Sequence, residues 1–383
     1  MHLFRLFVLI VCASPGLLWA AYLPSIDDSP SASYPGDLLQ SVTRYVASKV
    51  SVSGTSNQSR DHFNGSLNLV SNDLIWSQHQ FGITYYDSVI PKEGKETSEL
   101  KLNYGFAVSD IALRMNFETN DRSDVSVASD YRFGSRSEGQ LFRLEGRSPW
   151  FTWHGLRFNS VFSHSVGTNS VFEDNDWKED SLHQTSKMGL EYSEDRSFWP
   201  GLTSSTRIAA FSGVDIREEE SGNGSSEARE QFQKLALTTS LRQELYNWTL
   251  DLGARYQFAS SDLPSSEWLK IAGPSLSHGY NGQSRSAPEG GWLRLQAGSP
   301  GFYLPVFTGV RSSFQMSVLH GWTPVLDATD DRSAGASVGE LSMQFASRNF
   351  QAAMSVGKML GASEDLVPIA SSPDVSLSVI IGL

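Results

Sequence analysis

Apolar and polar residues alternate with a period of two along most of this chain, and this pattern limits the possible folds more than any other feature. In the segment LKLNYGF (100–106) the apolar side chains stand at the even positions, from Leu100 to Phe106. The same alternation runs through 111–118, 248–258 and 375–383. A period of two is that of a β-strand, and alternation over about nine to eleven residues is typical of a transmembrane β-strand. The sequence therefore predicts an all-β protein.

Long and short connections between these segments alternate in turn. The long polar connections fall at 53–62, 87–97, 120–137, 166–182, 214–230, 261–290, 320–336 and 359–373. The short turns fall at 72–76, 107–109, 148–152, 195–202, 244–247, 299–303 and 346–348. Such an asymmetry is typical of outer-membrane barrels, which have long external loops and short periplasmic turns. We expect a transmembrane antiparallel β-barrel of about 16 strands.

The size of such a barrel decides which face points outward. A barrel of about sixteen strands is too wide for its own side chains to fill, so its interior holds water or a plug. The polar face should then line the lumen and the apolar face should contact the lipid bilayer, with closure satisfying every backbone hydrogen bond. A soluble β-sandwich or β-helix with the same alternation remains the alternative fold.

The start of the chain predicts export from the cytoplasm. Residues 1–20 combine a short basic start with an apolar stretch and a small residue before the expected cleavage, as in a secretory signal peptide. Residues 21–42 are rich in Pro and Ser and predict a flexible periplasmic lead-in, and the barrel is expected over 43–383. We expect the protein in the outer membrane of a Gram-negative bacterium, inserted by the outer-membrane assembly machinery.

Composition excludes several other classes of protein. The sole cysteine, Cys12, lies in the predicted signal peptide, which leaves no disulfide framework and no cysteine metal cluster. The net charge of −12 argues against a nucleic-acid partner. We expect no cofactor and no metal, because the acidic runs lack calcium-loop spacing and the Gly-rich run 222–226 lacks the lysine of a phosphate-binding loop.

The connection at 261–290 has a more specific texture than the others. It contains IAGPSLSHGYNG (271–282), with LPSSEWLK before it and GGWLRL after it. These residues resemble the two-partner secretion transporters, the haemolysin and adhesin activator family, whose pattern is "L…SE-x-F-x-I-G-G-x-x-S-V-R-G-Y/F" followed by a strand that opens with "G-W". The positions that match are Leu263, Ser266, Glu267, Ile271, Gly273, Gly279, Tyr280 and Trp292.

The resemblance implies a barrel of sixteen strands that passes an unfolded exoprotein across the outer membrane. It also implies that the sixth long loop folds back into the lumen. Its turn would be Gly273, Pro274 and Ser275, and its tip, at the family's R-G-Y/F position, would be His278, Gly279 and Tyr280. The family's wall partner is an Asp in a D-x-G motif, and the corresponding wall positions facing the tip are Leu319 and Gly321.

The chain departs from this family at two points that matter for the tip. The family's Arg is His278 and the family's Asp is Leu319, so the bidentate, always charged pair is absent. His278 is a pH-sensitive latch or, more simply, a polar loop residue. Tyr280 is expected to be a packing anchor rather than a ligand contact. A third departure is that 21–42 offers no room for the family's periplasmic POTRA domains.

Enzymatic chemistry finds little support. The eight histidines form no H-E-x-x-H motif, and no G-x-S-x-G motif is present. His154, His164 and His183 lie near Ser163, but His164 and Ser163 would point to opposite faces of one strand. We therefore expect no enzyme, although a barrel hydrolase with a histidine at its rim is a further alternative.

Two functions follow from the resemblance. The first is a passive conduit for a secreted exoprotein passenger, with loop 261–290 as the plug in its lumen. The second is a POTRA-less outer-membrane channel or scaffold of the same fold that does not secrete, or one that works with a separate periplasmic POTRA-type protein.

Overall fold

The computed structural model describes residues 49–58, 63–73, 77–90, 95–128, 131–154, 156–174, 176–222, 224–259, 263–303, 309–324, 334–347, 350–363 and 372–382. All of them lie in one compact unit, Val46–Leu383. The predicted signal peptide (1–20) and lead-in (21–42) lie outside the described residues. None of the described residues forms a helix long and apolar enough to cross a membrane.

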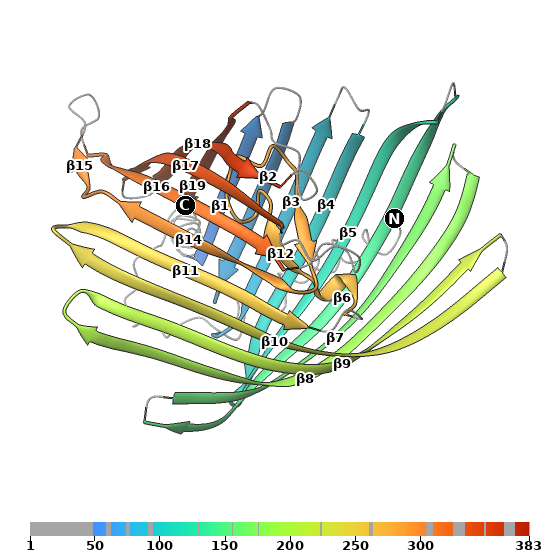
Figure 1. Ribbon diagram of the computed structural model, residues 1–383, viewed down its shortest axis with the longest axis horizontal. Helices are drawn as coiled ribbons and strands as arrows, with labels where there is room; N and C mark the ends of the chain where they lie inside the picture. Colours follow the sequence, from blue (N-terminus) through green and yellow to red (C-terminus); the bar gives the residue numbers. More distant parts are fainter. Residues whose placement is uncertain are drawn as a thin grey trace, which may run out of the picture. The chain divides into compact units, whose positions relative to one another are not determined.

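The unit is a closed antiparallel β-barrel, as the alternation predicts (Figure 1). Its first eleven strands follow one another in the sheet: β1 (Val50–Gln58), β2 (Phe63–Asn72), β3 (Gln80–Ile90), β4 (Lys95–Val108), β5 (Ile111–Ala128), β6 (Tyr131–Trp153), β7 (Leu156–Glu173), β8 (Asp176–Trp199), β9 (Leu202–Ser221), β10 (Gly224–Leu245) and β11 (Trp248–Ala259). The sheet continues through β14 (Gly290–Gly298), β15 (Phe302–Tyr303), β16 (Arg311–Thr323), β17 (Ala334–Ala346), β18 (Phe350–Ala362) and β19 (Asp374–Gly382).

The barrel has sixteen strands, as predicted, when β14 and β15 are counted as one. The short β15 pairs with β16 just beyond the end of the β14–β16 ladder, so β14 and β15 together form one side of a single hairpin. The ring closes where β1 pairs with β19, from Ser51↔Gly382 to Gln58↔Val375. Closure leaves the sheet without a free edge, which is the condition for a sheet to exist in lipid.

The outward face is apolar, and its side chains line up across neighbouring strands. Leu241, Leu252, Leu295 and Val318 stand in register on β10, β11, β14 and β16, and all of them are exposed. Large aromatic side chains are exposed at the short-turn end, as in the girdles of outer-membrane barrels: Trp150, Phe151, Trp153, Phe198, Trp199, Tyr246, Trp248 and Tyr303. This band is the surface that a lipid bilayer would cover.

Several predicted long loops are strands for most of their length, and their predicted bounds were wrong, most of all at three hairpins. The ranges 120–137, 166–182 and 214–230 are spanned by hairpins β5–β6, β7–β8 and β9–β10. Most of their residues are polar because the hairpins extend beyond the apolar band, and cross-strand contacts hold them together there. Arg136 forms an ion pair with Asp121 at 2.5 Å, and Ser137 Oγ donates to Asn169 Oδ1 at 2.7 Å. Polarity indicated the edge of the apolar band and not the end of the strand.

An arginine at Leu252 tests the assignment of the outward face. Leu252 is 38% exposed in the middle of the apolar row, so Leu252→Arg should lower the free energy of unfolding in lipid vesicles by roughly 2–4 kcal/mol. Ser240→Arg is the matched control, because Ser240 pairs with Gly253 on the opposite face of the same strands. Equal losses from the two substitutions would show that the outward face is not the lipid face.

Candidate functional site

The connection from β11 to β14 carries its own small structure. It contains a 3₁₀ turn (Ser265–Glu267) and two short strands, β12 (Leu269–Ala272) and β13 (Arg285–Ala287), which pair with each other and not with the barrel sheet. Figure 1 shows β12 within the curve of the barrel strands. This connection is the sixth long loop of the prediction, between the eleventh and twelfth strands. We refer to residues 263–289 as the lumen loop.

The lumen loop packs against one part of the barrel wall. Leu269, Ile271, Ala272, Tyr280 and Ala287 of the loop form a buried cluster with Leu319, Ala334, Ala336, Val338 and Met359 of β16, β17 and β18. Ile271, Tyr280 and Leu319 are completely inaccessible to solvent. Burial raises the pKa of Tyr280 to about 12, and its hydroxyl has no hydrogen-bond partner among the described residues. Tyr280 is therefore a neutral packing anchor at every physiological pH.

Glycines allow the loop to turn and to touch the wall. Gly273 opens the turn with φ +146°, and its carbonyl accepts from the N–H of Leu276 at 2.9 Å. Gly279 has φ +112°, and a Cβ atom there would lie 2.5 Å from Val338 Cγ2 and 2.6 Å from Lys358 N. Any larger residue at 279 would be strained and would push the tip away from the wall.

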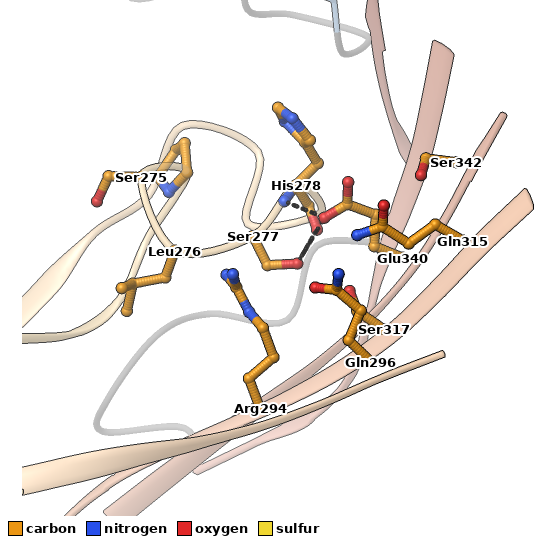
Figure 2. A pocket seen from close by; sticks show the side chains of 11 residues that line it. Ser275, Leu276, Ser277, His278, Arg294, Gln296, Gln315, Ser317, Glu340 and Ser342 are labelled. Atoms are coloured by element: carbon orange, nitrogen blue, oxygen red, sulfur yellow. Dashed lines mark hydrogen bonds between the residues drawn. The ribbon is translucent and has the colours of Figure 1, made fainter. Parts of the chain in front are cut away.

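Two wall carboxylates hold the tip by its backbone. Asp374 Oδ2, at the start of β19, accepts from the N–H groups of Gly279 at 2.9 Å and Asn281 at 2.6 Å. Glu340 Oε2, on β17, accepts from the N–H of His278 at 3.0 Å and from Ser277 Oγ at 2.8 Å (Figure 2). Hydrogen bonds to a charged acceptor are about twice as strong as neutral ones. The tip is thus bound by four charge-assisted hydrogen bonds.

The imidazole of His278 adds a weaker contact. Its Nε2 lies 3.1 Å from Ser376 Oγ on β19, while its buried Nδ1 has no partner within the described part of the chain. The backbone of His278, rather than its side chain, therefore makes the charged contact with the wall.

The expected wall positions lie near the loop but away from the tip's polar contacts. Leu319 shares the buried cluster with Tyr280, and a Cβ atom at Gly321 would overlap the carbonyl of Ile271, at the base of the loop. The polar contacts of His278 and Gly279 go instead to β17 and β19. Sequence reasoning missed Glu340 and Asp374. For Glu340 a signal was available, because Glu340 shares the inward face of its strand with Val338 and Ser342.

A polar cavity of about 220 Å³ lies between the turn of the loop and the wall. Pro274, Ser275 and His278 line it from the loop, and Arg294 and Glu340 line it from the wall. Figure 2 shows Arg294 reaching from β14 toward the loop. The predicted turn and tip residues therefore border a space that water can enter.

The base of the loop is fastened by a second set of charges. The Glu267 carboxylate accepts from Lys187 Nζ at 2.6 and 2.7 Å and pairs with Lys234 Nζ at 2.5 Å. Gln257 Nε2 donates to the carbonyls of Glu267 at 3.1 Å and Pro288 at 2.8 Å. Burial raises the pKa of Glu267, but the charges of Lys187 and Lys234 and their hydrogen bonds outweigh it and hold that pKa below its ordinary value.

The histidines weighed for an enzyme do not form a catalytic group with Ser163. His164 Nδ1 lies 2.8 Å from Ser186 Oγ on the neighbouring strand, whereas Ser163 is buried on the opposite face of β7. His154 lies in the turn after β6, and His183 on β8 lies opposite Gly167 on β7. The structure therefore leaves these residues as separate features of the barrel.

The chain matches one family model, described as haemolysin secretion/activation protein ShlB/FhaC/HecB, over residues 160–339. Among solved structures it is similar to CdiB from Escherichia coli, with a TM-score of 0.66 and 14% identity over 87% of this chain and 62% of that one. It is also similar to CdiB from Acinetobacter baumannii, with a TM-score of 0.65 and 14% identity over 87% of this chain and 60% of that one. No curated protein matches the chain in sequence.

The sequence of residues 160–339 and the fold of the barrel are similar to those of two-partner secretion transporters. The resemblance seen in the sequence is thereby confirmed, and the family is one of outer-membrane transporters of the type V pathway. The matched range 160–339 includes the lumen loop and both lysines that hold Glu267. It ends within β17, one residue before Glu340. The chain spans about six tenths of the length of the two transporters to which it is similar.

Neutralising Asp374 should loosen the tip of the transporter's loop. In Asp374→Asn the amides of Gly279 and Asn281 lose a charged acceptor, so their hydrogen exchange should speed up roughly tenfold or more. The amides of β12 serve as the internal control, because they belong to a different anchor. Unchanged exchange at Gly279 and Asn281 would show that Asp374 does not hold the tip.

The pKa of Glu267 gives the base of the loop a defined pH dependence. Because this pKa is lower in the folded barrel than the ordinary value of 4.5, the ion pairs stabilise fully above that pH. Their contribution is lost as the pH falls below 4.5 through the folded pKa. Glu267→Gln should therefore cost up to about 3 kcal/mol in free energy of unfolding near neutral pH and less in acid. A cost that does not change with pH would contradict the assignment of the charged pair.

Proposed function

We propose that the protein is a passive conduit in the outer membrane of a Gram-negative bacterium, through which an unfolded exoprotein leaves the cell. The observation that carries this proposal is the lumen loop, which lies against the inner wall and is fastened there by side chains. Ladder hydrogen bonds with the barrel strands would make such a loop part of the sheet, whereas contacts of a few individual side chains can break without opening any strand pair. The loop is then a closure that moves when a passenger enters.

The proposed mechanism needs no energy source in the barrel itself. A lumen lined by polar and charged residues lets an extended chain exchange its hydrogen bonds along the wall, and folding outside the cell draws the passenger forward. Its partners are the exoprotein, the lipid bilayer and the outer-membrane assembly machinery that inserts the strands. We assign the capture of the exoprotein to POTRA-type domains outside the barrel, on this chain or on a separate periplasmic protein.

A second candidate is a channel or scaffold of the same fold that does not export protein. The fastening of the lumen loop at two places, Glu267 at its base and residues 277–281 at its tip, favours this candidate. A barrel whose loop never leaves the wall would remain closed to a polypeptide. The two candidates therefore differ in whether the loop has to move.

Removal of the loop measures what it blocks. In planar bilayers, the purified barrel lacking 272–288 should conduct several times more current than the intact protein, because the deleted residues occupy the lumen. A barrel shortened at the β9–β10 hairpin by removal of 218–227 is the control, since this segment lies beyond the apolar band. An unchanged current after deletion of 272–288 would show that the loop is no plug.

A cross-link then separates transport from a closed channel. Cysteines introduced as Ser277→Cys and Glu340→Cys, whose native side chains meet at 2.8 Å, can be joined by a short bis-maleimide. The chain's sole cysteine, Cys12, lies in the predicted signal peptide. Export of a co-expressed exoprotein should stop on cross-linking and continue in each single-cysteine variant. Export that survives the cross-link would contradict a moving loop.

A further inference from the structure

A strongly basic cavity lies beside the base of the lumen loop. It has a volume of about 430 Å³, and the cationic side chains that line it are Arg143, Lys187, Lys234, Arg255 and Lys270. A single carboxylate, that of Glu267, lines the cavity with them. The excess of positive charge is local, because the whole chain carries a net charge of −12. Such a concentration of one sign inside a barrel attracts ions of the opposite sign.

Glu267 shows which chemical group this wall accepts. Its carboxylate sits between the ammonium groups of Lys187 and Lys234, which also lie 5.7 and 5.8 Å from the centre of the Phe211 ring. Both lysine side chains are almost covered, with exposed fractions of 14% and 10%. Lys187 and Lys234 of the wall thus form a preformed binding site for one carboxylate, which we call the Lys187–Lys234 cradle. The loop itself supplies the bound carboxylate, that of Glu267.

The other cations of the cavity have no such occupant. Arg255 is exposed to the lumen and forms no hydrogen bond or ion pair with any described residue, and the charged groups that act on it, Arg207 of β9 and Lys234 of β10, are both cations. Arg143 has one long contact of 4.0 Å, with Glu145 on its own strand. Lys270 is exposed and lines the same cavity. Guanidinium groups in this setting bind carboxylates and other oxyanions in a bidentate manner.

We propose that this cavity is an anion-binding site, with Arg255 as the first contact and the Lys187–Lys234 cradle as the inner one. Its ligands are groups with the chemistry of Glu267, which are the carboxylates of an acidic polypeptide segment or a small oxyanion such as phosphate. An incoming anion competes with Glu267 for the two lysines and so weakens the base of the loop. This last coupling rests on the proposed closure by the loop, whereas the binding site does not.

Calorimetric titration of the complete, detergent-solubilised protein tests the site directly. Hexaglutamate should bind at low ionic strength and lose affinity as salt is added. Titration with inorganic phosphate distinguishes the two sources of anion: phosphate binding without hexaglutamate binding identifies a small oxyanion as the ligand. Absence of binding by both anions would overturn the proposal.

Two substitutions with opposite expected effects connect the binding to this cavity. Arg255→Gln should weaken the affinity for the bound anion roughly tenfold, because a charge-assisted contact is lost. Glu267→Gln should strengthen it several-fold, because the internal competitor is neutralised. Arg229→Gln, on the exposed part of β10 near its hairpin, is the matched control and should leave the affinity unchanged.

These outcomes separate a specific site from a general disturbance of the barrel. Damage to the fold would lower the affinity in both Arg255→Gln and Glu267→Gln, and would overturn the proposal. Equal losses in Arg255→Gln and Arg229→Gln would do the same, because they would show attraction to the whole protein. Failure of protein export with intact anion binding would remove the proposed function and leave this site in place.

Discussion

The width of the barrel is the constraint on which the rest of the structure depends. A ring of sixteen strands encloses more space than its inward side chains can fill, so a packed interior requires another part of the chain. The lumen loop supplies it: the buried cluster around Ile271, Tyr280 and Leu319 forms between this loop and β16–β18. The main apolar core of this protein is therefore an interface between a loop and a wall, while the apolar rows of the outward face are left for lipid.

The electrostatics of the tip follow from the same arrangement. Asp374, which is only 1% exposed, accepts two backbone N–H groups on Oδ2, which offsets part of the cost of burying its charge, while its buried Oδ1 has no hydrogen-bond partner among the described residues. A wall carboxylate can thus hold the tip without an arginine on the loop. His278 occupies the position of the family's arginine. Side-chain charges alone therefore suggested that the tip had lost its charged contact with the wall. The backbone of the same residues makes the contact.

Period-two alternation predicted the strands, because it is a local property of the chain; the spacing of the connections then gave the strand number and the position of the sixth loop, and the width of such a barrel gave the outward face. The alternation failed at the hairpins β5–β6, β7–β8 and β9–β10, where strands leave the apolar band and lose the alternation but keep their cross-strand ladders. It also could not pair Gly279 with Asp374 or His278 with Glu340. These partners are 95 and 62 residues apart, and their meeting depends on how the loop lies across three strands.

The two fastenings of the loop have opposite polarity, and this difference has a mechanical consequence. At the tip the wall supplies the carboxylates and the loop supplies N–H donors. At the base the loop supplies the carboxylate of Glu267 and the wall supplies Lys187 and Lys234. An anion arriving in the lumen competes at the base and is repelled by Asp374 and Glu340 at the tip. The loop would then be released from its base first, with Tyr280 still buried as the pivot.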